Sequence, residues 1–381
     1  MTNAVAAANN SVFTSTNDVP LQVGAPGARR LRVAVLGCGR MGQRHAYNIY
    51  HLTPRAELVA IADPSPMAEQ WVKENLSSVN YYKTTDEVFA IPDLDAVVIA
   101  TITSTHAPLT LQAIDRGLHV LLEKPITIDY ESSVPVVEAA EAHPELKVMI
   151  GFVRRFDKAL LELYNHVQAE RAGTPYVLKS VSQDVYDSTG YFVQYARGNG
   201  GIFMDCGIHD IDMSRWLLNT QSAGRQEVKR VIASGLIAAH PELEEMDDCD
   251  NAFCIIEYAN GTSATLHLSR TGMAGYNSSV ELMGMKQNCT VSTPPSSRIK
   301  VADFDGHHNP TPATYLDRYG EAFISEMNEF AAICLDDKAV PTTAYDALQA
   351  AKIAKALTVS FLTGSPVSFN KAGEPIIDKA V

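Results

Sequence analysis

The stretch that most constrains the fold is a short apolar run that leads into a glycine-rich turn and then into a helix. Leu31–Leu36 is apolar enough for a buried parallel strand, and Gly37-Cys-Gly39-Arg-Met-Gly42 follows it directly. The glycines permit a tight turn and the close approach of a pyrophosphate to the N-terminus of the helical stretch Gln43–Tyr50. Because strand, loop and helix come in this order, the sequence predicts a dinucleotide-binding α/β domain.

An acidic residue stands where such a domain binds the adenosine ribose. The next predicted strand, Glu57–Ala62, ends at Asp63, 21 residues after Gly42. A carboxylate at this place accepts hydrogen bonds from the ribose hydroxyls and repels a 2′-phosphate, which favours NAD over NADP. Arg40, inside the glycine loop, could accept that phosphate, so NADP stays open as an alternative.

The first half continues as alternating helices and strands, which is typical of a parallel sheet with helices on both faces. We expect this doubly wound Rossmann domain to span 29–150. Glu123-Lys124-Pro125 follows the predicted strand His119–Leu122. Ligands of open α/β sheets bind at this carboxyl edge. Lys124 could also be a solvated loop lysine, but its position favours a functional role.

The second half changes to strands with partial period-two alternation. They indicate an α+β domain over 151–344 with a large, mostly antiparallel, open sheet, and Asn260-Gly261 predicts a hairpin within it. One face of such a sheet needs helices and the other often meets another subunit, so we expect a homo-oligomer, a dimer or a tetramer. We expect 345–381 to form a C-terminal helix and tail that pack back on the body, 1–28 to be a disordered tail, and Pro294–Pro312 to be a long loop.

The segment Gly200–Trp216 holds the acid–base candidates. Asp205 and His209 are four residues apart, so a continuous helix would place both side chains on one face. A carboxylate one turn from an imidazole suits proton abstraction near neutral pH, because the histidine takes the proton and the aspartate orients the ring. The alternative is a polar helix face in solvent. We expect Asp210 and Asp212 to have supporting or structural roles.

Charge and cysteine usage restrict the partners. The formal net charge of −13 and a pI near 5.3 argue against a surface for nucleic acid or an anionic membrane. No apolar run of the sequence approaches the length of a membrane span. The six cysteines contain no CxxC pair, which favours a reduced, cytoplasmic location over a disulfide framework.

With these residues in view, the chain resembles the glucose–fructose oxidoreductase and inositol dehydrogenase superfamily over nearly its whole length after residue 29. The phrase Ile208-His-Asp-Ile-Asp-Met-Ser-Arg-Trp216 and the pair Arg154-Arg155 resemble the inositol 2-dehydrogenase branch. Motifs in a fixed order carry the resemblance: Gly37-x-Gly39-x-x-Gly42, Asp63, Thr101 with His106, Glu123-Lys124-Pro125, Gly151-Phe-Val-Arg-Arg-Phe-Asp157, and Gly200-Gly-x-x-x-Asp205-x-x-x-His209-Asp-x-Asp212.

The resemblance implies an NAD-dependent dehydrogenase that moves hydride between a ring hydroxyl of a cyclic polyol or sugar and the nicotinamide. In that reading His209 removes the hydroxyl proton, Lys124 donates a hydrogen bond to the developing alkoxide, and Asp205 positions the substrate. Which of Lys124 and His209 is the base stays open. The implied substrate contacts are Lys124, Arg154, Gln183, Asp205, His209 and Tyr276. The implied cofactor contacts are Gly37, Gly39, Arg40, Met41, Gly42, Asp63, Thr101, His106, Glu123 and Lys124.

Two positions depart from the family's pattern. Ile102 stands where the family often has a proline, and Gln183-Asp184 stand where inositol dehydrogenases tend to place a histidine. A changed hydrogen-bonding group changes which hydroxyl pattern is accepted, so an aldose or a glycoside stays open as the substrate.

Three alternatives compete with this interpretation. A metal site could use Asp205, His209, Asp210 and Asp212, but it would leave the glycine loop and Lys124 unexplained, so we expect no metal. A non-catalytic nucleotide-sensing regulator could use the same fold, but it would not need both the lysine and the histidine. A carbonyl reductase could use the same residues, with His209 returning the proton.

Overall fold

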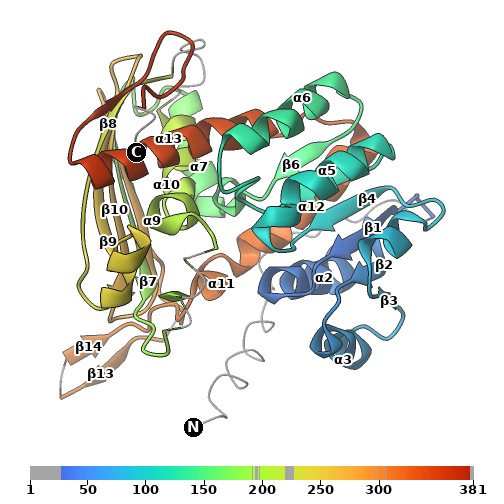
Figure 1. Ribbon diagram of the computed structural model, residues 1–381. Coiled ribbons are helices and arrows are strands. Elements are labelled where there is room, and N and C mark those ends of the chain that lie inside the picture. The colour runs from blue at the N-terminus through green and yellow to red at the C-terminus, as the bar shows by residue number, and fades with distance from the viewer. Residues whose placement is uncertain are drawn as a thin grey trace. The chain divides into compact units, whose positions relative to one another are not determined.

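The computed structural model describes residues 27–190, 192–193, 196, 198–218, 227–297, 299–304 and 306–377, so nearly all of the predicted tail 1–28 lies outside the described residues. The chain divides into two compact units, and Figure 1 labels their elements. Among the described residues, the first unit consists of the parts of the chain within Thr16–Phe156 and Glu321–Leu348. The second consists of those within Asp157–Gly320 and Gln349–Val381.

In the described part of the first unit, six strands form a wholly parallel sheet. Its order, β3-β2-β1-β4-β5-β6, is that of a doubly wound dinucleotide fold, so the predicted Rossmann architecture is confirmed. The strands are β1 (Leu31–Leu36), β2 (Ala56–Ala62), β3 (Asn80–Tyr82), β4 (Ala96–Ile99), β5 (His119–Leu122) and β6 (Val148–Ile150). Between and after them come α2 (Arg40–Leu52), α3 (Pro66–Asn75), α4 (Thr85–Phe89), η1 (Thr103–Thr105), α5 (His106–Asp115), η2 (Glu131–Ser133), α6 (Val134–Ala142) and η3 (Val153–Phe156).

Helix α12 (Gly320–Asp336) packs with this first sheet from Glu321 onward, although it lies far downstream in the sequence. Met327 and Phe330 of α12 are buried in the same apolar core as the side chains of β1 and β2. The grouping differs from the predicted domain 151–344, which placed this helix with the second sheet. The reason is that the apolar pattern of a helix shows that one face is buried but does not indicate which sheet covers that face.

In the described part of the second unit, seven strands form one sheet in the order β12-β11-β7-β10-β9-β8-β15. Neighbouring strands are antiparallel except for the central pair β7 and β10, which runs parallel. The turn at Asn260-Gly261 joins β9 to β10 as predicted. The strands are β7 (Pro175–Val185), β8 (Val228–Leu236), β9 (Asn251–Tyr258), β10 (Ser263–Gly272), β11 (Asn277–Gly284), β12 (Asn288–Val291) and β15 (Val367–Ser368).

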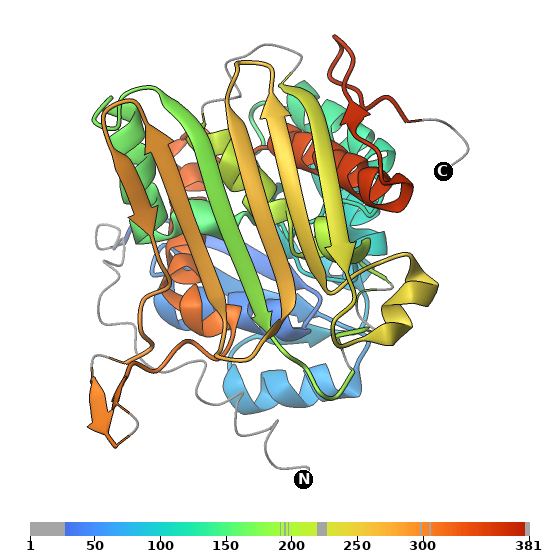
Figure 2. The same cartoon turned by 90° about the vertical axis from the view of Figure 1, so that its left-hand side faces the viewer.

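Helices lie against one face of this second sheet, and Figure 2 looks onto the other face, which no described helix of the unit covers. Along β9, Ala252, Cys254 and Ile256 are buried, whereas Phe253 and Ile255 between them are about half exposed. This alternation is the period-two pattern of the sequence. The helical elements of the unit that the structure describes over their full bounds are α7 (Lys158–Gln168), α9 (Gly201–Asp205), α10 (Ile208–Leu217), η5 (Pro241–Met246), α11 (Tyr315–Arg318) and, from Gln349 on, α13 (Ala344–Thr363).

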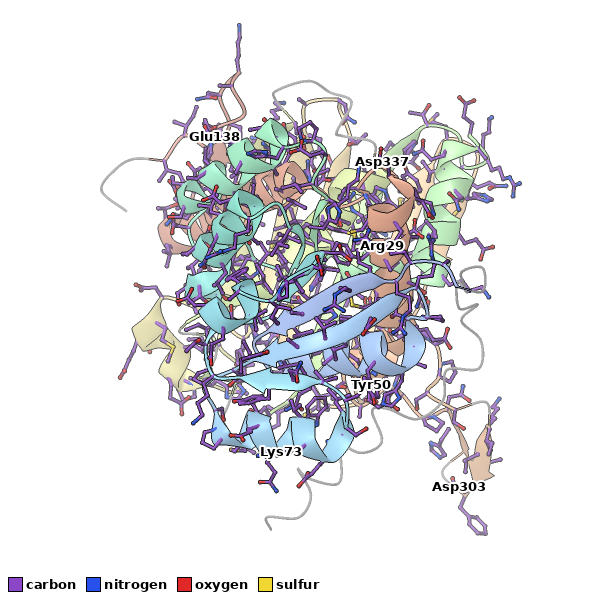
Figure 3. All side chains as sticks on the ribbon, turned by 90° about the vertical axis from the view of Figure 1, so that its right-hand side faces the viewer. Arg29, Tyr50, Lys73, Glu138, Asp303 and Asp337 are labelled. Atoms are coloured by element: carbon purple, nitrogen blue, oxygen red, sulfur yellow. The ribbon has the colours of Figure 1, made fainter. Side chains whose placement is uncertain are left out.

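Two local features of the second unit differ from the sequence-based expectations. The stretch that carries Asp205 is not one helix, because α9 ends at this residue and α10 begins at Ile208. The predicted loop Pro294–Pro312 contains a small antiparallel hairpin of β13 (Val301–Asp303) and β14 (Gly306–His308), with Asp303 labelled in Figure 3. No helix in the described part of the chain has the length and apolar composition that a membrane span needs.

Candidate functional site

The glycine loop between β1 and α2 is shaped by close approaches at two of its glycines. Gly37 has a φ of +88°, and a Cβ on it would lie 2.5 Å from the carbonyl oxygen of Ala100, just past the end of β4. A Cβ on Gly42 would lie 1.9 Å from the carbonyl oxygen of Gly37, so the first turn of α2 packs directly on the loop. A Cβ on Gly39 would meet nothing within 4 Å, which leaves room beside this residue.

Asp63 follows β2 and is oriented by the loop that it faces. Its Oδ2 accepts a hydrogen bond from the backbone N–H of Cys38 at 2.7 Å, and its Oδ1 accepts one from the N–H of Ser65 at 2.8 Å. The hydroxyl of Tyr81 donates to the carbonyl oxygen of Asp63. The partly buried carboxylate is therefore held beside the loop between β1 and α2.

These features fit a bound NAD. The open side of Gly39 and the backbone N–H groups at the N-terminus of α2 suit the pyrophosphate, and the Asp63 carboxylate suits the ribose hydroxyls. At the start of the helix, Arg40 is exposed and Met41 is partly buried. The structure thus brings the predicted cofactor residues between Gly37 and Asp63 together around one loop.

Lys124 follows β5 at the carboxyl edge of the same sheet. Its side chain is partly buried, and its peptide bond to Pro125 is cis. His106 is buried, with Nδ1 2.8 Å from the carbonyl oxygen of Pro125 and Nε2 3.2 Å from that of Thr101. Burial lowers the pKa of His106, so the neutral ring donates to one of these two carbonyls. His106 therefore joins the loop after β4 to the segment that carries Lys124.

Glu123 is paired with a buried histidine that our sequence analysis missed. His45 Nε2, on α2, lies 2.7 Å from Glu123 Oε1, and the imidazole is fully buried. Burial alone would raise the pKa of Glu123, but the contact with His45 and the charge of Lys124 lower it below its ordinary value. The ionised carboxylate of Glu123 therefore precedes Lys124 directly in the sequence, and its Oε1 is already paired with His45.

A second buried carboxyl group, Glu326 on α12, also belongs to the first unit. Among the described residues, neither of its carboxyl oxygens has a hydrogen-bond partner. Burial raises the pKa of Glu326 well above its ordinary value, and the charge of Glu123 raises it further. Burial therefore favours the protonated form of Glu326 over the carboxylate. Nothing in the local sequence pattern of α12 distinguishes this position.

The two consecutive arginines of η3, in the first unit, have different expected roles. Arg154 and Arg155 are both buried. Arg155 Nη1 donates to the carbonyl oxygen of Pro341 at 2.7 Å, and its Nη2 lies 3.6 Å from Asp346 Oδ1. Arg155 therefore fastens the downstream segment of this unit, and Arg154 is the member of the pair for which we predict a substrate contact.

Asp205 and His209, in the second unit, lie on either side of a widened helical turn. The N–H of Gly207 donates to the carbonyl oxygen of Ile202 at 2.9 Å, five residues back instead of the four of an α-helix. A Cβ on Gly207 would lie 2.7 Å from Leu268 Cδ1, so the absence of a side chain lets β10 approach this closely. Asp205 is buried, and His209, in the first turn of α10, is partly exposed.

Two hydrogen bonds in the second unit involve predicted substrate residues, and an arginine donates one of them and an asparagine the other. Arg270 Nη2 donates to Asp205 Oδ2 at 2.7 Å, a partner that our sequence analysis missed. Asn277 Nδ2 donates to Gln183 Oε1 at 3.0 Å across the β7–β11 pair. Tyr276, next to Asn277, is buried. Within this unit, Asp205 is hydrogen-bonded to β10, Gln183 lies on β7, and Tyr276 directly precedes β11. These three strands are neighbours in the second sheet.

Asp210 has the supporting role that the sequence analysis expects. It is fully buried, and its Oδ1 and Oδ2 accept hydrogen bonds from Ser182 Oγ at 2.9 and 2.8 Å. Ser180 Oγ also donates to its Oδ1. Both serines are on β7, so Asp210 ties α10 to the central strand.

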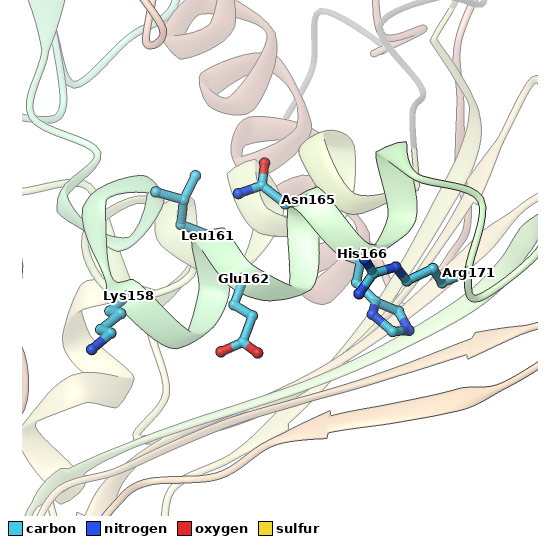
Figure 4. Close-up of a pocket in the computed structure, with 6 residues that line it drawn as sticks. All are labelled: Lys158, Leu161, Glu162, Asn165, His166 and Arg171. Atoms are coloured by element: carbon cyan, nitrogen blue, oxygen red, sulfur yellow. The ribbon is translucent and has the colours of Figure 1, made fainter.

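A hollow on α7 is separate from these residues (Figure 4). One of its lining residues is His166, whose Nε2 lies 2.6 Å from Gln287 Oε1. None of the predicted cofactor or substrate residues lines it, so we do not include it in the candidate site. Its lining residues are Lys158, Leu161, Glu162, Asn165, His166 and Arg171.

Comparison with known proteins gives matches over both units. Residues 31–152 match the model of an oxidoreductase family with an NAD-binding Rossmann fold, and residues 160–289 match the GFO/IDH/MocA C-terminal domain. Scyllo-inositol 2-dehydrogenase (NAD(+)) of Bacillus subtilis is 31% identical over 90% of this chain and 97% of its own length. Inositol 2-dehydrogenase of Rhizobium meliloti is 31% identical over 86% of this chain and 95% of its own.

Among solved structures, scyllo-inositol dehydrogenase of Lactobacillus casei with bound NAD(H) and scyllo-inositol matches with a TM-score of 0.83 and 29% identity, over 89% of this chain and 99% of that one. These matches confirm the resemblance drawn from the motifs, and they agree with the fit of the glycine loop and Asp63 to NAD. The chain belongs to the GFO/IDH/MocA family of NAD-binding oxidoreductases, in its inositol dehydrogenase-like branch.

Proposed function

We propose that the chain is a dehydrogenase that uses NAD to oxidise a ring hydroxyl of a cyclic polyol or sugar of the inositol kind. The observation that carries this proposal is the glycine loop with the oriented Asp63 carboxylate in the first unit, and the second unit supplies the buried Asp205 and the partly exposed His209. The relatives named as inositol 2-dehydrogenases support the substrate class. Six cysteines with free thiols support a reduced, cytoplasmic location.

The proposed chemistry divides among three side chains. Bound NAD⁺ supplies the hydride acceptor. His209, partly exposed at the start of α10, takes the proton of the reacting hydroxyl, and Asp205 orients the substrate beside it. Lys124 donates a hydrogen bond to the oxygen as negative charge develops there. Lys124 and His209 stay alternatives for the base, because each can hold the proton.

The substrate contacts that we propose besides these are Arg154, Gln183 and Tyr276. The contact from Asn277 Nδ2 at 3.0 Å fixes the orientation of the Gln183 amide. An amide in place of a histidine presents a different hydrogen-bonding pattern, which favours a different arrangement of ring hydroxyls. An aldose or a glycoside is therefore the second substrate candidate.

A substrate panel tests the proposal. Purified protein is mixed with NAD⁺ and, one at a time, with inositol isomers, aldoses and glycosides, and the absorbance of the reduced cofactor is followed. We expect turnover with at least one ring compound. In the reverse direction, NADH with the corresponding ketone tests for a carbonyl reductase. Binding of NAD without turnover of any compound would contradict the proposal and favour a nucleotide-sensing regulator.

We also propose that the chain is a homo-oligomer, a dimer or a tetramer, formed through the face of the second sheet that Figure 2 presents. Two large apolar side chains on it, Ile255 and Phe253, are 44 and 50% exposed and alternate with buried residues of β9. Exposed apolar side chains on one sheet face favour a protein–protein contact.

A further inference from the structure

Arg270 is a buried charge at the end of an apolar row. Along β10, the alternate residues Ala264, Leu266 and Leu268 are all buried on the face toward the helices. Arg270 continues this row, and its side chain is only 6% exposed. A guanidinium at such a position is retained only with partners that offset its desolvation.

A bulge in β10 sets the position of this arginine. In the parallel pairing of β10 with β7, Ser269 lies opposite Gln183 but Gly272 lies opposite Val185, so Arg270 and Thr271 together face one residue of β7. That residue is Asp184. Bulges turn side chains out of the regular alternation and occur frequently beside active sites. A Cβ on Gly272 would lie 2.9 Å from the carbonyl oxygen of Asp184, so glycine is needed for this close pairing.

The guanidinium is held on several sides. Arg270 Nη2 donates to Asp205 Oδ2 at 2.7 Å, and Nη1 lies 3.9 Å from Asp184 Oδ2. Its Cζ lies 3.9 Å from the centroid of the Phe192 ring, a cation–π contact that fixes its plane. The neighbouring titratable groups are Asp184 from β7, Asp205 and Cys206 from the end of α9, and Asp248 and Cys249 from the segment before β9.

We propose that Arg270 is a positioning residue of the candidate site, which holds the Asp205 carboxylate ionised and in one orientation for catalysis. This inference rests on the proposed function of Asp205. A guanidinium at hydrogen-bond distance favours the charged form of a carboxylate, and its planar fork restricts the rotation of the carboxylate. The alternative is an ion pair that contributes to folding alone.

Two variants of Arg270 and one control distinguish these roles. Arg270→Met removes the charge but keeps much of the side-chain length, and Arg270→Lys restores the charge without the planar fork. The control is Arg215→Lys, because Arg215 and Glu227 form another buried ion pair of the same unit, at 2.7 Å, and neither of them is a predicted substrate residue. Urea unfolding of each variant identifies the conditions in which it is folded.

The kinetic measurements use the ring compound that the wild-type chain turns over. For Arg270→Met we expect kcat to fall about 100-fold while the dissociation constant of NAD changes less than about threefold. The acid limb of the pH profile of kcat/KM should move upward by about one pH unit or more, because Asp205 then ionises less readily. Arg270→Lys should recover part of kcat and part of the shift in the pH profile, and Arg215→Lys should change neither kcat nor the pH profile. A wild-type profile in folded Arg270→Met would overturn the proposal.

A second measurement does not depend on turnover. Infrared difference spectra between each chain and its Asp205→Asn derivative report the protonation of the Asp205 carboxyl as the pH is lowered. We expect this protonation at higher pH in the Arg270→Met chain than in the wild type. An unchanged titration would overturn the proposal. If the titration moves but the wild-type chain turns over no ring compound, the coupling of Arg270 to Asp205 stands and the proposed function fails.

Discussion

His45 Nε2 and Glu123 Oε1 lie 2.7 Å apart inside the first unit, where the imidazole is fully buried. The contact joins α2, the helix that follows the glycine loop, to the residue before Lys124. The loop that fits the pyrophosphate and the lysine that we propose for catalysis are therefore fastened to each other by one buried interaction.

Substitution His45→Leu should destabilise the chain by about 3–5 kcal/mol, because it leaves the Glu123 carboxylate buried without its partner. Urea unfolding at pH 7 measures this change. The double variant His45→Leu with Glu123→Gln removes the buried charge as well, so it should recover much of the loss. If the urea midpoint of unfolding of His45→Leu equals that of the wild type, the pair does not contribute this stability.

Substitution Glu326→Gln should change how stability depends on pH. An acid with a raised pKa in the folded chain binds its proton more tightly there than in the unfolded chain. Its contribution is therefore complete below the unfolded pKa of about 4.3 and is lost as the pH rises toward the folded pKa, at about 1.4 kcal/mol per pH unit. Since glutamine does not ionise, Glu326→Gln should become more stable relative to the wild type from pH 5 to pH 8.

Urea unfolding across that pH range measures this difference. Glu321→Gln, at an exposed position of the same helix, is the matched control and should show a difference that stays nearly constant. A constant difference for Glu326→Gln as well would mean that Glu326 is ionised in the folded chain.

Substitution Asp63→Ala should weaken NAD binding about 10- to 100-fold, since it removes charge-assisted hydrogen bonds to the ribose. The ratio of NAD to NADP affinity should fall, because the repulsion of a 2′-phosphate is removed. Titration calorimetry with both cofactors checks the two effects. Asp115→Ala, at an exposed position on α5, is the control and should leave both affinities unchanged. A preserved preference for NAD would remove Asp63 from cofactor selection.

Substitutions Lys124→Ala and His209→Ala should each reduce kcat about 100-fold or more, because each removes a group that we propose to exchange or stabilise the reacting proton. The dissociation constant of NAD should stay within a few-fold of the wild type. Lys158→Ala and His166→Ala remove the same side-chain types from α7 and serve as controls. A near-full rate for either site variant would show that its proposed role is wrong.

Substitution Phe253→Glu should reduce the oligomer that we propose. The Phe253 ring stacks on His267 at 4.6 Å across the β9–β10 pair, on the face of the sheet that carries no described helix. A carboxylate there would be desolvated by a second copy, which disfavours association. Light scattering after size-exclusion chromatography gives the mass. Met67→Glu, at an exposed position on α3, should leave it unchanged. A wild-type mass for Phe253→Glu would exclude this face as the interface.

Much of the fold could be predicted because its signals are local. The buried strand before Gly37, the acid at Asp63 and the turn at Asn260-Gly261 each depend on residues that are near one another in sequence. Parallel strands are buried on both faces and read as apolar runs, and the second sheet reads as an alternation because only one of its faces is covered by helices.

The features that could not be predicted depend on partners far apart in the chain. The pairs His45–Glu123 and Asp205–Arg270 join residues on separate elements, and a single sequence gives no pairing information for them. The spacing of Asp205 and His209 is equally compatible with one helix or two. The widened turn between them depends on how closely β10 packs against Gly207, which is a tertiary contact. An arginine within a row of buried apolar residues was nevertheless a usable signal for Arg270.

The shared direction of β7 and β10 has a consequence for chemistry. Parallel strands finish at the same edge of a sheet, so Asp184 near the end of β7 and Arg270 near the end of β10 become neighbours. With opposite directions the two residues would stand roughly 25 Å apart, at about 3.3 Å per residue over the length of the pair. Parallel strands cannot be joined by a tight turn, and here the chain between β7 and β10 passes through α9 and α10, with Asp205 and His209, and then through β8 and β9 of the same sheet. The shared direction of β7 and β10 thus places Asp184 beside Arg270. The chain that joins the two strands includes Asp205 and His209.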